Sequence, residues 1–235
     1  MGSSVMSQTS YTPEQLLGRL NDVEAKNAPK ELFVAGDVEL LRAGRRVSVV
    51  GSRDVSEAGI RRARKLVKAL VAQDIVVVSG LAAGIDTVAH TTAISSGGRT
   101  VAILGTPLDK YYPAANKNLQ QSIMSAHAAV SQFPSGYPAT PKNFPMRNRT
   151  MALLTDATVI VEAGEKSGTR HQGWEALRLG REVFILSNVA ENPDLSWPQE
   201  MIAYGAQVLS AEGLEPALEN LPAYTDRMEV DAFAF

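Results

Sequence analysis

The sequence predicts an α/β protein with a doubly wound, mostly parallel sheet flanked by helices. Two observations lead to this fold class. Short runs rich in β-branched residues recur between residues 47 and 210, and they are almost continuously apolar, as in strands buried on both faces. These runs alternate with stretches of helical spacing, which is the order that crossovers between parallel strands produce. The 45% hydrophobic composition of the 235 residues is enough for a sizeable core.

Seven apolar runs are expected to form strands, each followed by a turn that contains small or polar residues. They are Val47–Val50, Ile75–Val78, Thr100–Leu104, Ala129–Phe133, Thr158–Glu162, Glu182–Leu186 and Gln207–Leu209.

Five stretches between these runs are expected to be helices, with the glycines at 97, 98 and 180 as natural stops. They are Glu57–Gln73, Gly84–Ser96, Asn116–His127, Arg149–Leu154 and Gly173–Gly180. Prolines mark Phe133–Pro145 as a long connection. A connection of that length inside a compact domain is usually either functional or disordered.

The chain divides into three expected parts. Residues 1–35 form a small, polar leader and a short helical lead-in that starts at Thr12-Pro13-Glu14. Residues 36–210 form the α/β domain. Residues 211–235 form an acidic extension, helical at best over Ala211–Glu219, with a loose tail.

Composition excludes several kinds of protein. The chain has no Cys, which rules out a disulfide framework, Cys-ligated zinc, iron–sulfur clusters and thiol catalysis. No apolar run approaches the roughly 20 residues of a bilayer-spanning helix, and the first ten residues do not have the pattern of a signal peptide. The three His residues are scattered and give no metal signature. We therefore expect a cytoplasmic protein without cofactor, metal or membrane partner.

The net charge of −2 conceals a segregation of charge along the chain. The stretch from Arg42 to Lys68 contains nine basic residues and only two acidic ones, Asp54 and Glu57. From Val189 onward, nine acidic residues face Arg227 alone. Such runs are typical either of solvated helix faces or of a surface that binds an anion, and the sequence leaves both interpretations open.

Two loops at expected strand ends have the composition of anion sites. Gly51, Ser52 and Arg53 follow the first strand, and ligands of open α/β sheets bind beyond the carboxyl ends of strands. Arg53 offers a permanently charged fork for phosphate, or it pairs with a nearby carboxylate. The second strand runs through Ser79 into a loop bounded by Gly80 and Gly84, where glycines let a phosphate approach the backbone. The loop matches neither the dinucleotide fingerprint nor the P-loop.

Two further segments add cations, amides and hydroxyls. Lys142–Arg149 places Arg147, Asn148 and Arg149 around Phe144, a composition that single-stranded nucleic acids favour, although Phe144 could equally fill the core. Ser167–Thr169 follows a strand end and resembles a phosphate cradle that opens a helix, or a plain surface turn.

Taken together, these segments resemble the DNA-processing protein A family, also called Smf or DprA, whose core is an extended Rossmann-like domain. The resemblance covers residues 36 to 187 in order and spacing. The matching pieces are GDVELL from Gly36, VSVVGSR from Val47, VVSGLAAGIDTVAH from Val77, GGRTVAILGTPLDKYYP from Gly97, NFPMRNR from Asn143, VIVEAGEKSGT from Val159 and GREVF from Gly180.

The resemblance implies a non-enzymatic protein that binds single-stranded DNA, loads a RecA-type recombinase in recombination or natural transformation, and forms a homodimer. It also implies which residues line the DNA pocket. They are Ser52, Arg53, Ser79, Gly80, Gly84, Phe144, Arg147, Asn148, Arg149, Ser167, Gly168 and Thr169. The sequence departs from the family pattern after this last turn, where Arg170, His171, Gln172 and Trp174 replace small and aliphatic residues.

Two alternatives come from other classes of protein. Related folds include nucleotide sensors and nucleoside monophosphate phosphoribohydrolases, whose catalytic Glu stands three residues after a comparable Thr. Gln172 occupies that position here, and an amide cannot act as a carboxylate base. The third possibility is an interaction module in which the acidic tail Met228–Phe235 docks on a partner.

Overall fold

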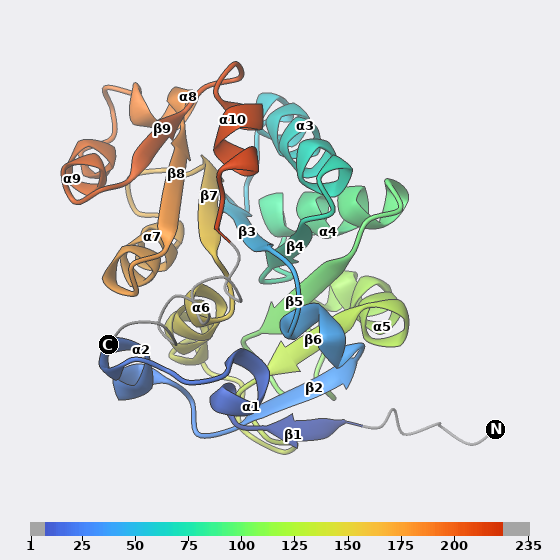
Figure 1. The fold of residues 1–235 in the computed structure, drawn as a ribbon. Coiled ribbons are helices and arrows are strands. Elements are labelled where there is room, and N and C mark those ends of the chain that lie inside the picture. The colour runs from blue at the N-terminus through green and yellow to red at the C-terminus, as the bar shows by residue number, and fades with distance from the viewer. Residues whose placement is uncertain (1–7, 223–235) are drawn as a thin grey trace.

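A computed structural model describes residues 8–222, which form a nine-stranded sheet with helices on both faces (Figure 1). The strand order is β1-β2-β6-β5-β4-β3-β7-β8-β9. Strands β3 to β9 run parallel to one another, while β2 is antiparallel to β6 and β1 is antiparallel to β2 at one edge. This arrangement confirms the α/β fold with a mostly parallel sheet.

The strands have the following bounds: β1 Thr9–Tyr11, β2 Leu32–Gly36, β3 Arg46–Gly51, β4 Val76–Ser79, β5 Thr100–Leu104, β6 Ala128–Ser131, β7 Ala157–Glu162, β8 Glu182–Leu186 and β9 Gln207–Leu209. The helices are α1 Pro13–Leu17, α2 Asp22–Asn27, α3 Glu57–Ala72, α4 Ile85–Ser95, α5 Lys117–Ala126, α6 Asn143–Leu153, α7 Thr169–Arg178, α8 Ser187–Ala190, α9 Trp197–Ala203 and α10 Leu214–Glu219. Two 3₁₀ turns, η1 Val38–Leu41 and η2 Ala114–Asn116, complete the set.

All seven expected strands are present, each within two residues of its expected bounds. These runs are almost continuously apolar because the strands are buried on both faces, as expected: every residue of β4 and β5 is buried. On β3, Val47 and Val49 pack into one core with α3 and α4, while Val50 packs on the opposite face with α6 and α7. The sheet is therefore covered on both faces, as a doubly wound fold requires.

The amino-terminal segment contains two strands that the sequence pattern did not predict. The short helices α1 and α2 are present as part of the expected lead-in, and each begins with a capping box. However, β1 and β2 also lie there, and β2 pairs with β6 across the boundary expected between residues 35 and 36. The five-residue run of β2 has no strict alternation and therefore no distinctive period, so the sequence pattern does not separate it from the helical lead-in.

Two helices begin earlier than predicted, and this changes where candidate residues lie. Helix α6 begins at Asn143 rather than Arg149, so Phe144 projects from a helix and not from the proline-rich connection, and Arg147 lies on the same helix. Pro145 is tolerated because it sits in the first turn, where a backbone N–H has no helical acceptor. Helix α7 begins at Thr169 rather than Gly173, and α8 and α9 were not predicted at all.

The strand order places a topological switch point between β3 and β7. From β3 the chain adds β4, β5 and β6 on one side, and it then returns to place β7, β8 and β9 on the other. Ligands of open α/β sheets bind in the crevice beyond the carboxyl ends of the strands at such a point. The loops that follow β3, β4 and β7 meet there.

Candidate functional site

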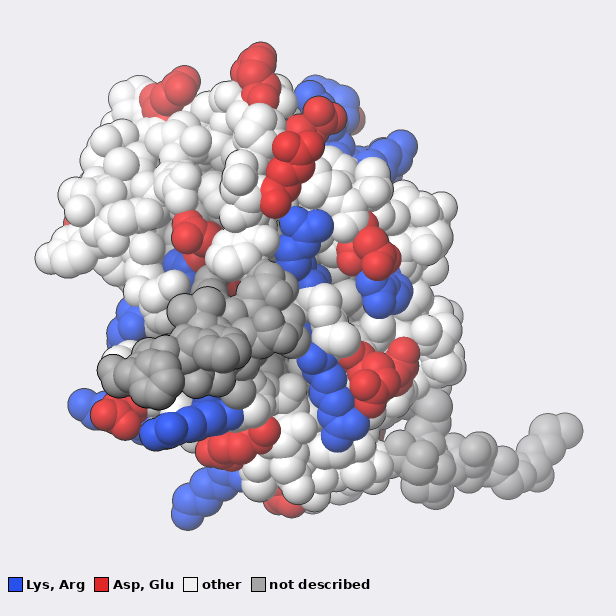
Figure 2. Space-filling view, in the orientation of Figure 1, with Lys and Arg blue, Asp and Glu red and all other residues white. Residues whose placement is uncertain are grey.

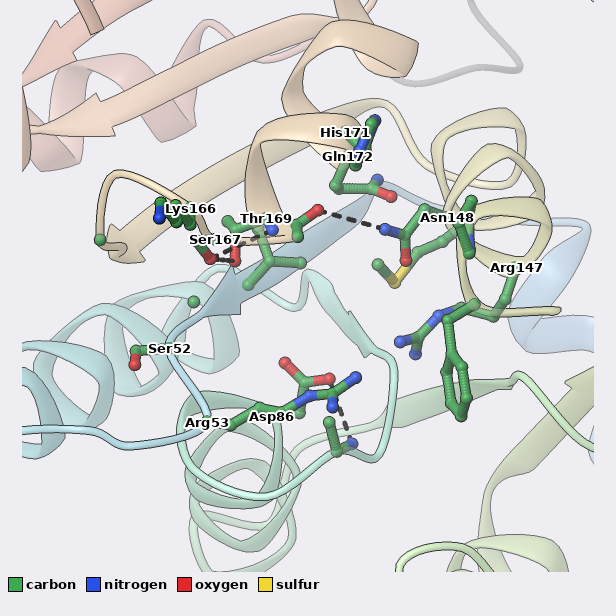
Figure 3. A pocket seen from close by; sticks show the side chains of 18 of the residues that line it. Ser52, Arg53, Asp86, Arg147, Asn148, Lys166, Ser167, Thr169, His171 and Gln172 are labelled. Carbon is green, nitrogen blue, oxygen red and sulfur yellow. Dashed lines mark hydrogen bonds between the residues drawn. The ribbon is translucent and has the colours of Figure 1, made fainter. Parts of the chain in front are cut away.

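A pocket of about 600 Å³ opens at the switch point (Figure 3). We call it the switch-point pocket. Residues 50–54 after β3, residues 164–169 after β7 and the first turns of α6 form most of its walls. Three cations, Arg53, Arg147 and Lys166, line it together with two carboxylates, Asp54 and Asp86. Figure 3 shows Arg53 and Asp86 across the pocket from Ser167 and Thr169.

The loop after β3 is held rigidly at its backbone. The N–H of Ser52 donates to the Glu162 carbonyl at 2.7 Å, and the Ser52 carbonyl accepts from the N–H of Ile85 at 3.1 Å. The Ser52 hydroxyl donates to the Asp54 carbonyl at 2.7 Å. The loop is thereby tied to β7 and to the start of α4. The Arg53 side chain leaves this fixed loop exposed and forms no salt bridge within residues 8–222.

The amino terminus of α3, where many Rossmann-like proteins bind phosphate, is already occupied by protein groups. The Ser56 hydroxyl accepts from the N–H of Gly59, and it donates to one Glu162 carboxylate oxygen at 2.6 Å. The other oxygen accepts from the N–H of Ser56 at 2.8 Å. Because a carboxylate caps this helix, an anion has to bind through the other loops of the pocket.

The glycines of the loop after β4 shape the pocket instead of lining it, while Ala82 between them is part of the wall. A Cβ at Gly80 would lie 1.4 Å from Nη1 of Arg147, so the missing side chain makes room for the guanidinium. Gly84 has φ +77° and approaches the Ser52 carbonyl so closely that a Cβ would lie 2.2 Å away. Ser79 is fully buried, and its hydroxyl donates to the Val49 carbonyl at 2.7 Å. These three candidates therefore support neighbouring parts of the site.

Arg147 and Asp86 form a buried charged pair on the pocket floor. Arg147 is 6% exposed and donates to the Ile103 carbonyl at 3.1 Å, while its Nε has no hydrogen-bond partner. Burial raises the pKa of Asp86 above its ordinary value, although the Arg147 charge and the N–H of Ala82 partly oppose this. Burial likewise lowers the pKa of the Arg147 guanidinium, opposed by Asp86 and reinforced by nearby Arg53. The Arg147 and Arg53 charges thus lie close to one buried carboxylate.

Helix α6 contributes an aromatic ring and an amide. The Arg53 guanidinium lies 5.6 Å from the centroid of Phe144, within the range of a cation–π contact. The Tyr112 ring lies 5.4 Å from Phe144 and is 53% exposed. The Asn148 amide donates to the Gly168 carbonyl at 3.5 Å, which joins α6 to the loop after β7. Arg149 does not line the pocket, because it pairs with Glu175 at 2.9 Å.

The loop after β7 supplies hydroxyl and backbone donors. The Ser167 hydroxyl lies 2.9 Å from the Thr169 hydroxyl and accepts from the N–H of Thr169, while Gly168 is exposed. Glu165 anchors the loop from behind: its carboxylate accepts from the hydroxyl and the N–H of Ser196, which lower its pKa. This cradle opens α7, whose dipole favours an anion at this end.

The structure brings eight predicted residues into the pocket wall: Ser52, Arg53, Phe144, Arg147, Asn148, Ser167, Gly168 and Thr169. Sequence reasoning did not select Lys166 or Asp86 as lining residues, nor Tyr112 as a neighbour of Phe144. It considered Gln172 only as a replaced catalytic position. Gln172 lines the pocket, is 1% exposed, and has a side-chain oxygen without a hydrogen-bond partner.

The pocket has the donors of an anion site and lacks the ligands of a metal site. Nowhere in residues 8–222 do three His, Asp or Glu side chains come together as metal ligands would. Two buried polar atoms of the pocket, Nε of Arg147 and Oε1 of Gln172, are left for a bound molecule to satisfy. The arrangement therefore suits an oxyanion flanked by hydrogen-bonding groups.

Comparison with known proteins places the chain in a family. The model of the family DNA recombination-mediator protein A matches residues 5–221. The chain belongs to this family. DNA processing protein DprA of Streptococcus pneumoniae is 40% identical over 163 residues, which are 69% of this chain and 57% of the relative. Protein Smf of Escherichia coli is 35% identical over 218 residues, which are 92% of this chain and 56% of the relative. The chain thus spans little more than half the length of these family members.

Solved structures of the recombination-mediator family share the fold. DNA processing protein A of Streptococcus pneumoniae superposes with a TM-score of 0.76 at 33% identity, over 89% of this chain and 73% of the other. DNA processing protein A of Helicobacter pylori, described for its single-stranded DNA binding mode, superposes with a TM-score of 0.76 at 23% identity, over 93% of this chain and 97% of the other. These matches confirm the Rossmann-like fold. Within the part of the chain that the structure describes, no helix has the length and apolarity to cross a membrane.

Proposed function

We propose that this chain binds single-stranded DNA in the switch-point pocket and acts in DNA recombination through that binding. The observation that carries the proposal is the position of Arg53 and Arg147 across the pocket from the Ser167–Thr169 cradle. Guanidinium forks and hydroxyls on opposite sides of a pocket suit a phosphodiester. Membership of a family of DNA recombination mediators supports DNA as the source of that phosphate.

The aromatic rim favours a single strand over a duplex. Tyr112 is 53% exposed and lies beside Phe144, so it offers a ring face to an unpaired base at the edge of the pocket. Phe144 itself is half-buried and already carries the Arg53 guanidinium. The base-stacking role expected of Phe144 is therefore shared with Tyr112 in this proposal. In a duplex the paired bases are stacked inside and cannot reach such a ring.

Two further properties extend this proposal beyond the pocket. A recombination mediator has to hand its DNA to a recombinase of the RecA type, and a homodimer would place two pockets on one strand. Both features are proposals that rest on the family relationship. Sedimentation tests the dimer, and co-precipitation with a RecA-type recombinase tests the partner.

Binding of a free nucleotide is the second candidate, because a pocket of about 600 Å³ is large enough for a mononucleotide. A hydrolase of nucleoside monophosphates has less support. Gln172, three residues after Thr169, has an amide where such an enzyme needs a carboxylate, and its Nε2 lies 3.4 Å from the Thr158 hydroxyl. A nucleotide sensor remains as the alternative that the following experiment distinguishes.

Fluorescence anisotropy with a labelled oligothymidylate separates these functions. The proposal predicts that unlabelled single strands compete efficiently, that duplex and thymidine monophosphate compete poorly, and that affinity falls steeply as salt rises. Competition by the monophosphate as strong as that by the oligonucleotide would replace the proposal with the nucleotide sensor. Preference for duplex would reject it outright.

A further inference from the structure

A second, smaller groove lies on the same edge of the sheet as the switch-point pocket, with a floor of apolar side chains (Leu66, Leu186, Leu209, Ala211 and Leu214) and polar groups around it. Helix α3 forms one side and the carboxyl ends of β8 and β9 form the other. We call it the α3 groove. Its polar lining consists of Arg62, Lys65, Ser187, Asn188 and Ser210, and its volume is about 130 Å³. Ligands of α/β sheets bind at this edge, which makes the groove a candidate site by position alone.

The cations of the groove have no partner that neutralises them fully. Arg62 and Lys65 are three residues apart on α3, so their side chains share one face and repel each other. Neither forms a salt bridge with any residue from 8 to 222. The exposed Glu212 carboxylate lies near Lys65, and its lowered pKa comes mainly from hydrogen bonds of its own N–H and the Ser210 hydroxyl. Two cations and one nearby carboxylate leave the groove with a net positive charge.

The size of the groove selects a phosphate rather than a base. A volume of about 130 Å³ corresponds to about four water molecules at roughly 30 Å³ each. This admits one phosphate group and is well below the usual size of a pocket for a nucleoside. The half-buried hydroxyl of Ser187 lines the groove beside the two cations and can donate to a phosphate oxygen. The Asn188 amide donates one N–H to the Val161 carbonyl at 3.4 Å, and its second N–H is left for such an oxygen.

Helix α3 connects the groove with the switch-point pocket. The helix begins three residues after Asp54, a residue of the pocket wall, and the rise from Glu57 to Arg62 is about 8 Å. Gly59 packs against the Glu162 carboxylate, which is neutralised in part by the two hydrogen bonds from Ser56. Figure 2 shows Lys and Arg side chains gathered over α3 at the upper right of the molecule. A strand that leaves the pocket along α3 therefore meets a positive surface.

We propose that the α3 groove is a second phosphate site, which binds the backbone of the same single strand several nucleotides away from the switch-point pocket. This inference rests on the proposed function of the pocket. It assigns the basic run of α3, which the sequence left open as a solvated helix face, a role in extending the DNA path. Its contribution is electrostatic and independent of base sequence.

Oligonucleotide length separates the two sites. Anisotropy titrations compare oligothymidylates of about 6 and about 20 nucleotides with the wild type and with the double variant Arg62→Ala/Lys65→Ala. The variant should bind the short strand like the wild type, and it should bind the long strand several-fold more weakly, with a salt slope smaller by about 1.4. The matched control is Arg64→Ala/Lys68→Ala, which removes two exposed cations of the same helix that do not line the groove.

Each result has a defined meaning. Glu212→Gln should strengthen long-strand binding, because it removes a carboxylate near Lys65. Equal losses of long-strand affinity in the groove variant and the control would overturn the proposed phosphate site, because only the total charge of α3 would then matter. Loss of short-strand binding in the groove variant would also overturn it, since the site would then not be separate. If the wild type binds no single strand at all, the proposed function fails, and the groove fails with it.

Discussion

Arg53 and Arg147 show how two residues of the same type reach one pocket by different routes. Arg53 extends from a rigid loop into solvent, whereas Arg147 is buried on α6 over Gly80. The sequence predicted Arg53 from its place after a strand, and Arg147 from the cations and amides that surround Phe144. It could not predict that Arg149, two residues further on, turns away to Glu175, because helical phase depends on where α6 begins. Asp86 was not predicted as a pocket residue, because only the packing of the fold brings it near Arg147.

Replacement of Arg53 should weaken binding without loss of the fold. Arg53→Ala removes an exposed guanidinium that stabilises no described carboxylate, so the melting temperature should stay unchanged. The dissociation constant for oligothymidylate should rise about tenfold through the loss of one charged phosphate contact. Arg64→Ala, an exposed arginine of α3 outside the pocket, is the control for general charge. Equal effects of the two substitutions would remove Arg53 from the site.

Replacement of Gly80 should weaken DNA binding, because it displaces the Arg147 guanidinium. In Gly80→Ala the new methyl group overlaps Nη1 of Arg147, which must move out of its position over the loop. We expect a several-fold loss of affinity for single strands, with the fold retained because the end of a flexible side chain yields. Gly213→Ala, where the nearest atom lies 3.5 Å from the added carbon, is the matched control. Unchanged affinity of Gly80→Ala in the anisotropy titration would show that Arg147 is not needed where it lies.

At the scale of elements, the sequence was most informative where strands are buried on both faces. Short, almost continuous apolar runs rich in β-branched residues favour strands buried on both faces, so β3 to β9 were all predicted. Elements with mixed patterns were missed or shortened. β2 and the start of α6 depend on contacts with β6 and with Gly105, against which Phe144 packs, and no local period reveals such contacts. The aromatic neighbour of Phe144, Tyr112, was overlooked because tertiary packing alone brings the two together.

The contact of α4 with β5 makes stability depend on pH. His90 is fully buried, and its Nδ1 lies 2.7 Å from the Thr100 hydroxyl. Burial lowers the pKa of His90 from 6.5 to about 3, so the unfolded chain binds a proton between these values and the folded one does not. Stability is therefore complete above about pH 6.5 and falls as the pH decreases below it.

This effect is measured by urea unfolding at pH 7 and pH 5. Between these pH values the free energy of unfolding of the wild type should fall by about 2 kcal/mol more than that of His90→Gln, which has no titrating ring. His127, whose pKa burial also lowers, is present in both proteins and cancels in the comparison. Identical losses would mean that His90 is protonated in the folded state.

At the scale of the whole molecule, the amino-terminal segment is bound to the far side of the sheet. Glu24 on α2 and Arg181 before β8 form an ion pair at 2.5 Å, with both side chains 3% exposed. The pair joins segments 157 residues apart in the chain. It ties α2 to the segment before β8, and it could not be predicted because neither the capping box that contains Glu24 nor the GREVF segment that contains Arg181 indicates a contact with the other. Long-range pairs of this kind depend on the complete fold.

Glu24→Gln should destabilise the whole chain. The substitution leaves the Arg181 charge buried beside a neutral amide, which typically lowers the free energy of unfolding by about 3 kcal/mol. The control Glu39→Gln breaks the exposed pair with Arg42 at 2.9 Å, and it should change stability by less than about 1 kcal/mol. Urea denaturation checks both. Equal stabilities of the two variants would show that the amino-terminal segment folds apart from the sheet.

The central claim is that the switch-point pocket holds the DNA strand, and photochemical cross-linking tests it most directly. The protein is irradiated with an oligothymidylate, and the adducts are mapped by mass spectrometry. The account predicts adducts on the two aromatic residues of the rim, Tyr112 and Phe144, and it predicts that these adducts are reduced in Arg53→Ala. Adducts confined to residues outside the pocket, with the rim unmodified at saturating DNA, would contradict it.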